Sequence, residues 1–514
     1  MQLIAHFRDT MNPPVFLGAV AVILVFVVHG SLFTEHAEAT FEATQAYIVT
    51  HFGWFYILAA TGLLGFVGWL ALSRFGDIRL GGEDAEPDFN GLTWFTMLLA
   101  AGMGIGLVFF GVAEPMLHYA SPLEAEPETA AARQEAMLYT YFHWGLHPWA
   151  IYISIALPLA YFHFRHGLPL APRSLLYPLI GDRIKGWIGH VVDIVATVGT
   201  LFGVGTSLGL GAMQINAGFE ALFDVPMSLA VQLMVIAAIT ATATVSVVTG
   251  LSHGIRRLSE FNVGLAGLTL LFVVVAGPTV YILEIFTTSL GQYLQNLPRL
   301  SLTIDPVLGD DWQADWTLFY WSWWIAWCPF VGIFAARISR GRTIRAFVST
   351  MLLVPVVTGF FWFAALGGSA FFIEQFGPGG IIEPTLEDEA LSLFALLAQL
   401  PWPAITSTAG ILLVVVFFVT SSDSGSLVDV MVTSGGHPNP PAVYRVFWCV
   451  AEGVVAATLL IAGGLTALRT ASLTPALPMT IFLLVACYGL IKALQVDAAT
   501  EGRPETEALR GESR

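Results

Sequence analysis

Charged side chains are scarce in this sequence. They make up 11% of its 514 residues and apolar residues make up 56%, whereas charged residues reach about 25% in an ordinary soluble domain. The mean hydropathy is +0.74. These values exclude an ordinary soluble protein and predict an all-α integral membrane protein, because a membrane span must satisfy its own backbone polar groups.

Twelve apolar runs are long enough to cross a membrane, since a hydrocarbon core of about 30 Å needs about 20 helical residues. They are centred near residues 24, 63, 103, 150, 200, 239, 275, 326, 358, 415, 453 and 485. No small-residue cleavage site follows the first run, so we expect a retained span rather than a signal peptide.

Cysteine is rare as well. The three cysteines, Cys328, Cys449 and Cys487, all fall inside predicted spans, and no C-x-x-C spacing occurs, so neither a disulfide framework nor a cysteine metal site is expected. The sequence also lacks a Walker A string, an H-E-x-x-H string and a G-x-S-x-G string in a plausible setting. We therefore expect neither an enzyme nor a nucleic-acid-binding protein.

Basic residues are unevenly distributed between the two sides of the predicted spans. With the N-terminus inside, 18 of the 21 Lys and Arg residues are cytoplasmic, and only Arg133, Arg299 and Arg469 face out. The positive-inside rule then predicts that both termini are cytoplasmic. The outer loops are acidic and supply much of the net charge of −16, for which loop solubility is the usual explanation.

The stretch from residue 319 to residue 348 is the most distinctive in the chain. Four tryptophans fall within seven residues, followed by a Pro/Gly break and an arginine cluster: Trp321, Trp323, Trp324, Trp327, Pro329, Gly332, Arg337, Arg340, Arg342 and Arg345. On a helix, Trp323 and Trp327 share a face and Trp324 lies about 100° away, so the rings can wall a pocket suited to a cation. Anchoring of the tryptophans at the membrane interface is the alternative. The arginines that should mark the membrane edge come only after the Pro/Gly break, so the tryptophans lie too deep for interface anchors.

Glycines alternate in the third apolar run, at Gly102, Gly104 and Gly106. Each costs close to 1 kcal/mol relative to alanine inside a helix. Two interpretations compete: close helix packing, or an unwound segment whose backbone lines a mid-membrane site. A spacing of two residues favours the unwound segment, because positions i and i+2 face different sides of a helix.

The fourth run contains YFHWGLHPWAIY. Its aromatic residues Trp144, Trp149 and Tyr152 fit either a plain core or further walls of the tryptophan pocket. His143 and His147 are one turn apart, as zinc ligands can be. The run offers no carboxylate partner for a metal, so structural histidines are the preferred interpretation.

Hydroxyl groups cluster in the tenth run, at Thr420, Ser421, Ser422 and Ser424 around Asp423. Hydroxyl and carbonyl oxygens are the ligands that hard cations prefer, although hydroxyls also bond back to their own helix. A carboxylate inside a span is costly and suggests function. Asp193 is a second such acid, which fits a functional role and a structural role equally well. Glu452 is the interior charged residue of the last two runs.

Runs three to seven and runs eight to twelve each begin with a segment broken by Gly or Pro. Paired interruptions of this kind indicate an inverted-repeat transporter with a mid-membrane site. The predicted division is two scaffold helices and a loop (1–90), a first repeat (91–290), an interfacial helix and outer loop (291–315), a second repeat (316–495) and a tail (496–514).

Four strings are specific enough to indicate a family: AGMGIGLVFFGVAEP, HWGLHPWAIY, WSWWIAWCPFVGIFAARISRGRTIR and TSSDSGS. Throughout its length the chain resembles the betaine/choline/carnitine transporter family. The resemblance implies a leucine-transporter-type fold preceded by two extra helices, a homotrimer in the bacterial cytoplasmic membrane in contact with lipid, and ion-driven uptake of a trimethylammonium-type osmolyte.

The resemblance also implies roles for individual residues. The family's aromatic box matches Trp144, Trp149, Tyr152 and Trp324, and its second substrate contact matches Trp323 and Trp327. The sodium positions match Ala100, Met103, Phe417, Thr420 and Ser421, and a second ion site is expected near Thr200 and Phe330, where Val204 replaces a desirable hydroxyl. Family members that carry choline tend to have Asp where this chain has Gly106.

The leading hypothesis is a symporter for a zwitterion such as glycine betaine or dimethylsulfoniopropionate. A net cation needs a carboxylate in a low-dielectric site, and the mid-membrane parts of the broken helices are expected to offer none unless Asp423 reaches in. A zwitterion supplies its own anion, which backbone N–H groups around Gly102, Gly104 and Gly106 or a bound sodium ion can meet. No cofactor is expected besides sodium or, through Asp423, a proton. Alternatives are a proton-coupled choline or carnitine carrier, a neutral amino acid symporter and a membrane sensor without transport.

Overall fold

A computed structural model describes residue 7 and residues 10–102, 104–248, 252–304, 312–437 and 440–501. These residues form helices and connecting turns without a β-strand, and one isolated bridge joins Arg79 to Thr343. The all-α class predicted from the composition is confirmed. Helices are the expected solution because each satisfies its backbone hydrogen bonds within the segment.

The helices of 20 residues or more are α2 (Pro13–Leu32), α3 (Thr34–Leu72), α7 (Leu146–His166), α9 (Trp187–Phe223), α10 (Leu229–Val248), α11 (Ser252–Ala276), α12 (Thr279–Ser301), α14 (Ile344–Phe376), α17 (Pro403–Thr433) and α18 (Ala442–Glu501). The shorter helices are α4 (Gly91–Gly102), α5 (Ile105–Ala120), α6 (Ala130–Trp144), α8 (Tyr177–Ile180), α13 (Phe319–Arg337), α15 (Ile382–Glu387) and α16 (Ser392–Ala398). Short turns η1 (Arg74–Asp77), η2 (Pro172–Leu176), η3 (Gly181–Lys185) and η5 (Glu389–Leu391) are 3₁₀-helical, and η4 (Ala314–Leu318) is a π-helical turn leading into α13.

Within the described residues, nine helices are long and apolar enough to cross a membrane, or ten if a bent pair counts as one span. The chain is therefore a multi-pass membrane protein. The number is lower than the twelve predicted runs for physical reasons. The third run is split into the short helices α4 and α5, and α18 merges the last two runs into one continuous element.

Two glycines make the turn inside α18. Gly463 has φ 154° and Gly464 has φ 56°, backbone conformations that residues with a side chain rarely adopt. They divide α18 near the middle, between the apolar runs centred near residues 453 and 485. The last two predicted spans therefore meet at a glycine kink rather than across a loop.

The seventh predicted run, centred near residue 275, is not a single straight helix. α11 ends at Ala276, α12 begins at Thr279, and the two are bent by 110° relative to each other. Pro278 lies in the break, and proline both lacks a backbone N–H and disfavours helix at the preceding residue. The helix that follows the bend thus begins before residue 290, earlier than the interfacial helix was expected to begin.

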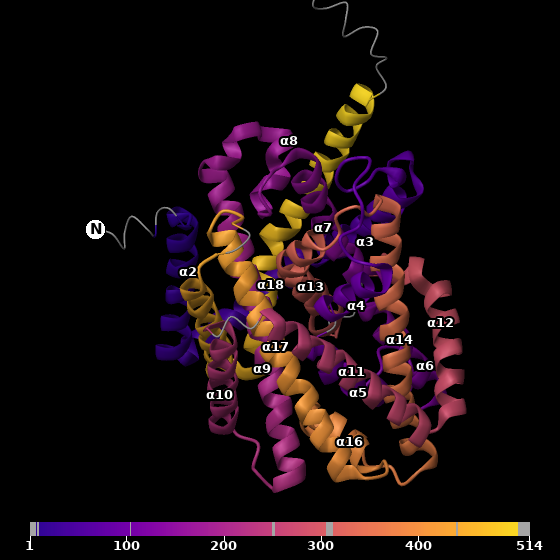
Figure 1. Cartoon of the computed structure of the whole chain (residues 1–514). Coiled ribbons are helices and arrows are strands. Elements are labelled where there is room, and N and C mark those ends of the chain that lie inside the picture. The colour runs from indigo at the N-terminus through magenta and orange to yellow at the C-terminus, as the bar shows by residue number, and fades with distance from the viewer. Residues whose placement is uncertain are drawn as a thin grey trace, which may run out of the picture.

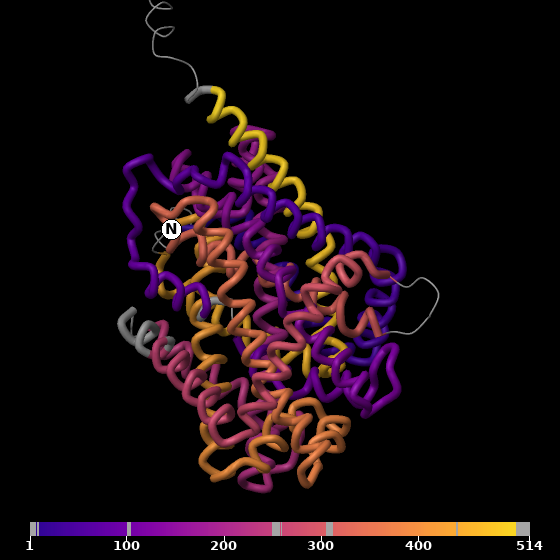
Figure 2. The backbone as a smooth tube through the Cα atoms, turned by 90° about the vertical axis from the view of Figure 1, so that its right-hand side faces the viewer, coloured from indigo at the N-terminus to yellow at the C-terminus, as the bar shows by residue number. Residues whose placement is uncertain are grey.

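α13 is the central helix of the bundle. It packs against α7, α9, α17 and α18, and side chains such as Trp321 and Trp323 are almost fully buried. Figure 1 shows α2 and α12 at opposite margins of the bundle. α2 exposes large apolar side chains such as Leu17 and Leu24, as expected for a helix that faces lipid. Figure 2 shows the last turns of α18, in yellow, extending beyond the helical body.

Candidate functional site

The third apolar run is broken next to the tryptophan helix. α4 ends at Gly102, and α5 begins at Ile105 after Gly104, whose backbone is extended at φ −120° and ψ −154°; Met103 lies outside the described residues. A Cβ atom built on Gly104 would lie 3.5 Å from the Trp327 ring and 4.0 Å from Ser421 Oγ. The break therefore lies where α13 and α17 meet, as an unwound mid-membrane segment should.

Gly106 lies against two of the predicted pocket rings. A Cβ atom there would lie 2.4 Å from Cη2 of Trp323 and 3.2 Å from Cη2 of Trp144. Real side-chain contacts are longer than 2.4 Å, so even alanine requires the Trp323 ring to move. Glycine at this position is thus needed for close ring packing, and an aspartate cannot simply be added to the site.

The four residues of the predicted aromatic box come together as a continuous row of rings. Trp144 and Trp324 have centroids 4.9 Å apart at 72°, Trp324 and Tyr152 are 6.3 Å apart at 79°, and Tyr152 and Trp149 are 5.6 Å apart at 81°. All four are buried. They come from three helices, because the chain breaks at Gly145 between α6 and α7 and α13 packs across both.

Trp323 and Trp327 extend this row along α13. Trp323 stacks on Trp324 with centroids 5.0 Å apart at 16°, and its indole N–H donates to the Gly203 carbonyl at 3.4 Å. Trp327 packs edge-on against Phe330 at 5.2 Å. Its buried indole nitrogen has no hydrogen-bond partner, and neither has the buried hydroxyl of Tyr152. Among the described residues, Tyr152 in the row and Trp327, one turn along α13 from Trp323, therefore each carry an unpaired donor.

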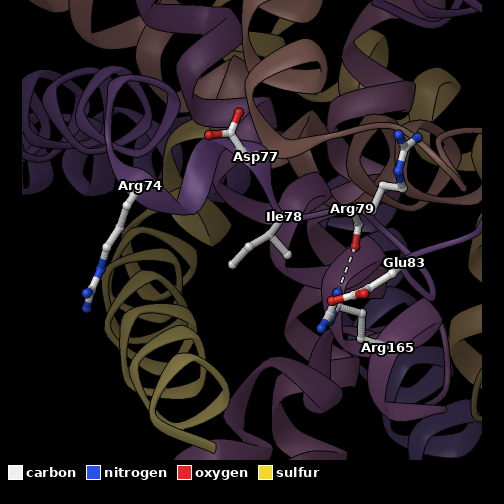
Figure 3. Close-up of a pocket in the computed structure, with 6 residues that line it drawn as sticks. All are labelled: Arg74, Asp77, Ile78, Arg79, Glu83 and Arg165. Atoms are coloured by element: carbon white, nitrogen blue, oxygen red, sulfur yellow. Dashed lines mark hydrogen bonds between the residues drawn. The ribbon is translucent and has the colours of Figure 1, made fainter. Parts of the chain in front are cut away.

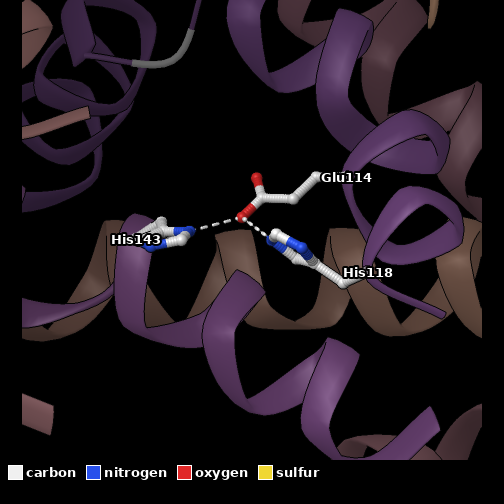
Figure 4. A group of neighbouring side chains, drawn as sticks. All are labelled: Glu114, His118 and His143. Atoms are coloured by element: carbon white, nitrogen blue, oxygen red, sulfur yellow. Dashed lines mark hydrogen bonds and ion pairs between the residues drawn. The ribbon is translucent and has the colours of Figure 1, made fainter. Parts of the chain in front are cut away.

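Glu114, on α5, is the functional candidate that the sequence interpretation missed. It is completely buried, and its Oε2 accepts hydrogen bonds from Tyr320 at 2.5 Å and from the Trp144 indole N–H at 2.7 Å. Its Oε1 lies 2.7 Å from His143 Nδ1 and 3.5 Å from His118 Nε2 (Figure 4). The expectation that the broken helices carry no carboxylate except Asp423 was therefore wrong.

The histidine interpretation needs a matching correction. His143 does have a carboxylate partner in Glu114, and its Nε2 lies 2.9 Å from the Thr317 hydroxyl. His147 is not part of that cluster; it stacks on Trp321 with centroids 5.1 Å apart at 20°. Ligand atoms of Glu114, His118 and His143 lie within 4.8 Å of one another. The 2.7 Å distance between His143 Nδ1 and Glu114 Oε1 is that of a hydrogen bond and is shorter than the spacing of two ligand atoms around one zinc ion. A structural role therefore fits these histidines best.

The predicted sodium positions lie on either side of the break. Ala100 is in α4, two residues before that helix ends, and Phe417, Thr420 and Ser421 are in α17. The Thr420 hydroxyl donates to the carbonyls of Val416 at 2.9 Å and Phe417 at 3.1 Å, the back-bonding that helical hydroxyls often show. Ser421 faces Gly104.

The second predicted ion site contains one unpaired oxygen. Thr200 on α9 is buried, and its hydroxyl has no hydrogen-bond partner. Phe330 on α13 is buried as well. α9 approaches α13 closely here, since a Cβ on Gly203 would lie 2.5 Å from the Trp327 ring.

Asp423, the predicted proton site, is held in an ion pair. One of its oxygens lies 2.6 Å from the Arg445 guanidinium and the other accepts from Ser246 at 3.2 Å. The paired arginine stabilises the charged carboxylate, so Asp423 differs from an acid that has no basic partner.

Arg469 lies at the end of the ring row. Its guanidinium is 5.6 Å from the Trp316 ring centroid and 5.5 Å from that of Phe319. It also pairs with Glu389 at 3.3 Å and with Asp315 at 3.7 Å. Burial raises the pKa of the Glu389 carboxyl above its ordinary value, and Arg469 opposes that rise.

A surface hollow of about 350 Å³ lies elsewhere, lined by Arg74, Asp77, Ile78, Arg79, Glu83 and Arg165 (Figure 3). Arg165 donates to the backbone carbonyl of Arg79 at 3.3 Å, and Asp77 pairs with Arg345 at 2.5 Å. The hollow contains none of the aromatic residues described above. Arg79 and Arg165 bond to backbone carbonyls and Asp77 pairs with an arginine outside the hollow, so the ring row is the stronger candidate.

Comparison with known proteins identifies the family of the chain. The sequence model of the betaine/carnitine/choline family transporters matches residues 14–499. The chain is 44% identical to a glycine betaine/proline/choline transporter of Vibrio parahaemolyticus, with 98% of this chain and 92% of the relative covered. It is 43% identical to a glycine betaine transporter of Bacillus subtilis over 93% of this chain and 94% of the relative. An uncharacterized transporter of Mycobacterium tuberculosis is 48% identical over 96% and 84%.

Proposed function

Because the chain belongs to the betaine/carnitine/choline transporter family, we propose that it is a secondary transporter that imports a glycine betaine-like zwitterion by ion-coupled symport. The observation that carries the proposal is the buried row of Trp144, Trp324, Tyr152 and Trp149 beside the helix break at Gly104. Broken helices at mid-membrane are where secondary transporters bind their substrates.

The onium end of the substrate is assigned to the ring faces. A quaternary ammonium within about 6 Å of an indole or phenol face is attracted by the ring quadrupole, with about 0.5 to 2 kcal/mol per face. Successive rings in the row lie at 72° to 81° to one another. They therefore offer faces in several directions, which suits a roughly spherical trimethylammonium group.

The carboxylate end is assigned to unpaired donors. The indole N–H of Trp327 and the hydroxyl of Tyr152 are buried without partners, and a buried donor without a partner is costly until something accepts from it. Trp327 lies beside Gly104, where the helix break frees backbone N–H groups. Gly102, Gly104 and Gly106 are the positions proposed to present them.

Glu114 bears on the net charge that the substrate can carry. A carboxylate does lie behind the rings, but its Oε2 already accepts from Trp144 and Tyr320 and its Oε1 from His143. Its charge is thus largely compensated within the protein. We keep the zwitterion as the preferred substrate. Choline and proline belong in the test because the Vibrio relative is named for glycine betaine, proline and choline.

Sodium, if it is the coupling ion, is proposed to bind between the end of α4 and α17, with ligands from Ala100, Met103, Phe417, Thr420 and Ser421. These residues offer hydroxyl and carbonyl oxygens, the hard ligands that such cations prefer. A second ion near Thr200 and Phe330 is a further proposal, supported by the unpaired Thr200 hydroxyl. Proton coupling is the alternative.

The architecture is proposed to contain twelve spans. The nine long apolar helices are joined by α4 with α5 as one broken span, by α11, and by the second half of α18 beyond its glycine kink. Residues 91–290 and 316–495 would then form the two inverted repeats of alternating access. A homotrimer in the bacterial inner membrane with both termini cytoplasmic completes the proposal.

Uptake into proteoliposomes tests this function. Labelled glycine betaine, choline, carnitine, proline and dimethylsulfoniopropionate are supplied separately under a sodium gradient and under a proton gradient. We expect accumulation of glycine betaine or dimethylsulfoniopropionate above choline under at least one gradient. Absence of accumulation of every compound under both gradients would favour a sensor that binds without transport.

A further inference from the structure

Two buried carboxylates lie where α17 meets α18, and neither forms an ion pair with a basic residue in the described part of the chain. Asp429 is completely buried, and both of its carboxylate oxygens lack a hydrogen-bond partner among the residues that the structure describes. Glu452 is also completely buried. Its Oε2 accepts from the Ser422 hydroxyl at 2.7 Å, and its Oε1 has no partner.

The helix register brings these groups into one stripe. Ser422, Gly425 and Asp429 lie at i, i+3 and i+7 on α17 and so share a face. A Cβ atom on Gly425 would lie 2.6 Å from Glu452 Oε1, which means that the carboxyl of Glu452 occupies the space that the missing side chain leaves. The stripe from Ser422 to Asp429 spans about 10 Å at 1.5 Å per residue.

Among the side chains that the structure describes, the surroundings supply no free basic group. On α17 and α18 the nearest charged pair is Asp423 with Arg445, at 2.6 Å. Cys449 lies 3.4 Å from Ser422 and 3.7 Å from Thr244 of α10.

The other helices around the stripe add little charge. α9 contributes the apolar Val204 over Gly425. Near the end of α17, Arg173 bonds to the Gly435 carbonyl and pairs with Asp193 of α9 at 3.6 Å. His190 of α9 contacts Asn12, whose backbone N–H donates to the Thr433 carbonyl.

A buried carboxylate without a basic partner is expensive in its charged form and avoids that cost by taking up a proton. Inside a membrane span, an acid of this kind is by default a functional candidate. Asp429 lies one turn from the end of α17, while Glu452 and Ser422 lie deeper, next to the hydroxyl cluster that includes Ser421. The stripe thus leads from that cluster to the end of the helix.

We propose that Asp429 and Glu452 form a proton-binding pair that carries the coupling proton during transport. Each carboxylate takes a proton from water when the site is open to one side, forming an O–H bond, and returns it to water on the other side. The Ser422 hydroxyl bridges Glu452 to the region of Ser421. The proposal rests on the proposed transport function and assigns its proton site to this pair rather than to the ion-paired Asp423.

The test uses wild-type protein and the variants Asp429→Asn and Glu452→Gln in proteoliposomes that contain a pH-sensitive dye. Without sodium, substrate added outside wild-type liposomes should acidify the lumen, and an inward proton gradient should drive accumulation. Each variant should lose at least tenfold in proton-driven accumulation and lose the acidification. Substrate binding, followed by tryptophan fluorescence, and substrate exchange without a gradient should stay within about twofold of wild type.

Matched variants control for packing. Asp429→Glu and Glu452→Asp keep a titratable group and should retain coupling. Asp193→Asn removes a buried acid that already has a basic partner and should also retain it. Retained proton flux in the Asn and Gln variants overturns the proposal. It is equally overturned if wild-type uptake needs sodium and moves no protons, a result that leaves the transport function intact.

Infrared spectroscopy of the wild-type protein gives a second test that does not depend on transport. At neutral pH, protonated carboxyl groups should give a carbonyl band separate from that of carboxylates, and the band should change when substrate is added. Absence of any protonated carboxyl band at neutral pH contradicts the pair. Failure of wild-type liposomes to accumulate any substrate refutes the proposed function instead. The pair is then tested by loss of part of the carboxyl band in Asp429→Asn and Glu452→Gln, because Asp193 and Glu389 can also give such a band.

Discussion

The indole N–H of Trp144 donates a hydrogen bond of 2.7 Å to Oε2 of the completely buried Glu114. The same oxygen accepts from Tyr320 at 2.5 Å, and Tyr320 in turn stacks on Trp324 with centroids 5.8 Å apart. The Glu114 carboxylate therefore holds the Trp144 indole directly and the Trp324 indole through the ring of Tyr320. Hydrogen bonds to a charged group are stronger than neutral ones, so Glu114 is a positioning residue for the proposed substrate site.

Glu114→Gln should weaken substrate binding by about tenfold or more. An amide oxygen cannot replace the charge-assisted bonds, which contribute about 1.5 to 3 kcal/mol each, and about 1.4 kcal/mol corresponds to tenfold. The dissociation constant from tryptophan fluorescence is the measurement. Tyr320→Phe removes one donor only and should have a smaller effect in the same direction. Unchanged affinity in Glu114→Gln would show that the rings hold their positions without the carboxylate.

Trp324→Leu should raise the half-saturation concentration for uptake by about tenfold or more, because it removes a central face of the ring row. Trp321→Leu is the matched control. Trp321 is on the same helix and equally buried, but it stacks on His147 rather than on the row. It should lower thermal stability while leaving half-saturation close to wild type. Equal effects of the two variants on half-saturation would indicate that the rings are only packing.

Thr420→Ala combined with Ser421→Ala should raise the sodium concentration needed for half-maximal uptake, since both hydroxyls are proposed ligands. Thr408→Ala on the same helix is the control. Its hydroxyl is exposed and bonds back to the Ala404 carbonyl at 2.6 Å, so sodium dependence should not change. If wild-type uptake is indifferent to sodium and follows pH, the sodium assignment fails and the proton pair becomes the coupling site.

Gly106→Ala should already impair uptake, because a Cβ atom there meets the Trp323 ring at 2.4 Å. Overpacking of this kind costs about 1 to 3 kcal/mol. The double variant Gly106→Ala with Trp323→Phe gives the methyl group room and should recover part of the activity. A fully active Gly106→Ala would mean that the ring moves freely. Gly106→Asp, which introduces the residue that choline-carrying family members tend to have, requires the same ring movement.

Local pattern predicted part of the geometry around the proposed site. Helical spacing placed Trp323, Trp324 and Trp327 correctly in a buried cluster, and the alternating glycines correctly indicated a helix break. Such features depend on a few neighbouring residues. The pairing of Trp144 with Trp324 depends on α13 crossing α6 and α7, and only the family resemblance supplied it in advance.

Glu114 was missed although its signal was present. It stands in the apolar string GLVFFGVAEP, and a carboxylate in such a run is a functional candidate by default. Asp429 in the tenth run offered the same signal. Their partners come from helices far away in sequence, as with Tyr320 for Glu114, so spacing alone could not reveal which acid is satisfied and which is not.

The number of single helices long enough to span differs from the twelve predicted runs for a related reason. Hydropathy detects apolar runs but does not show where a run is bent, broken or joined to its neighbour. Pro278 interrupts the seventh run, and Gly463 and Gly464 connect the last two without a loop. These residues act through backbone geometry, which a windowed average does not register.

The central claim is that the ring row recognises a quaternary ammonium attached to a carboxylate. The most direct measurement is the affinity of the wild-type protein for glycine betaine and for the same molecule with its methyl groups removed one at a time, namely dimethylglycine, sarcosine and glycine, followed by tryptophan fluorescence. The account predicts affinity that falls at each step, by roughly 100-fold or more in total, because each lost methyl exposes an N–H that the rings cannot satisfy. Equal affinity for glycine and glycine betaine would contradict it.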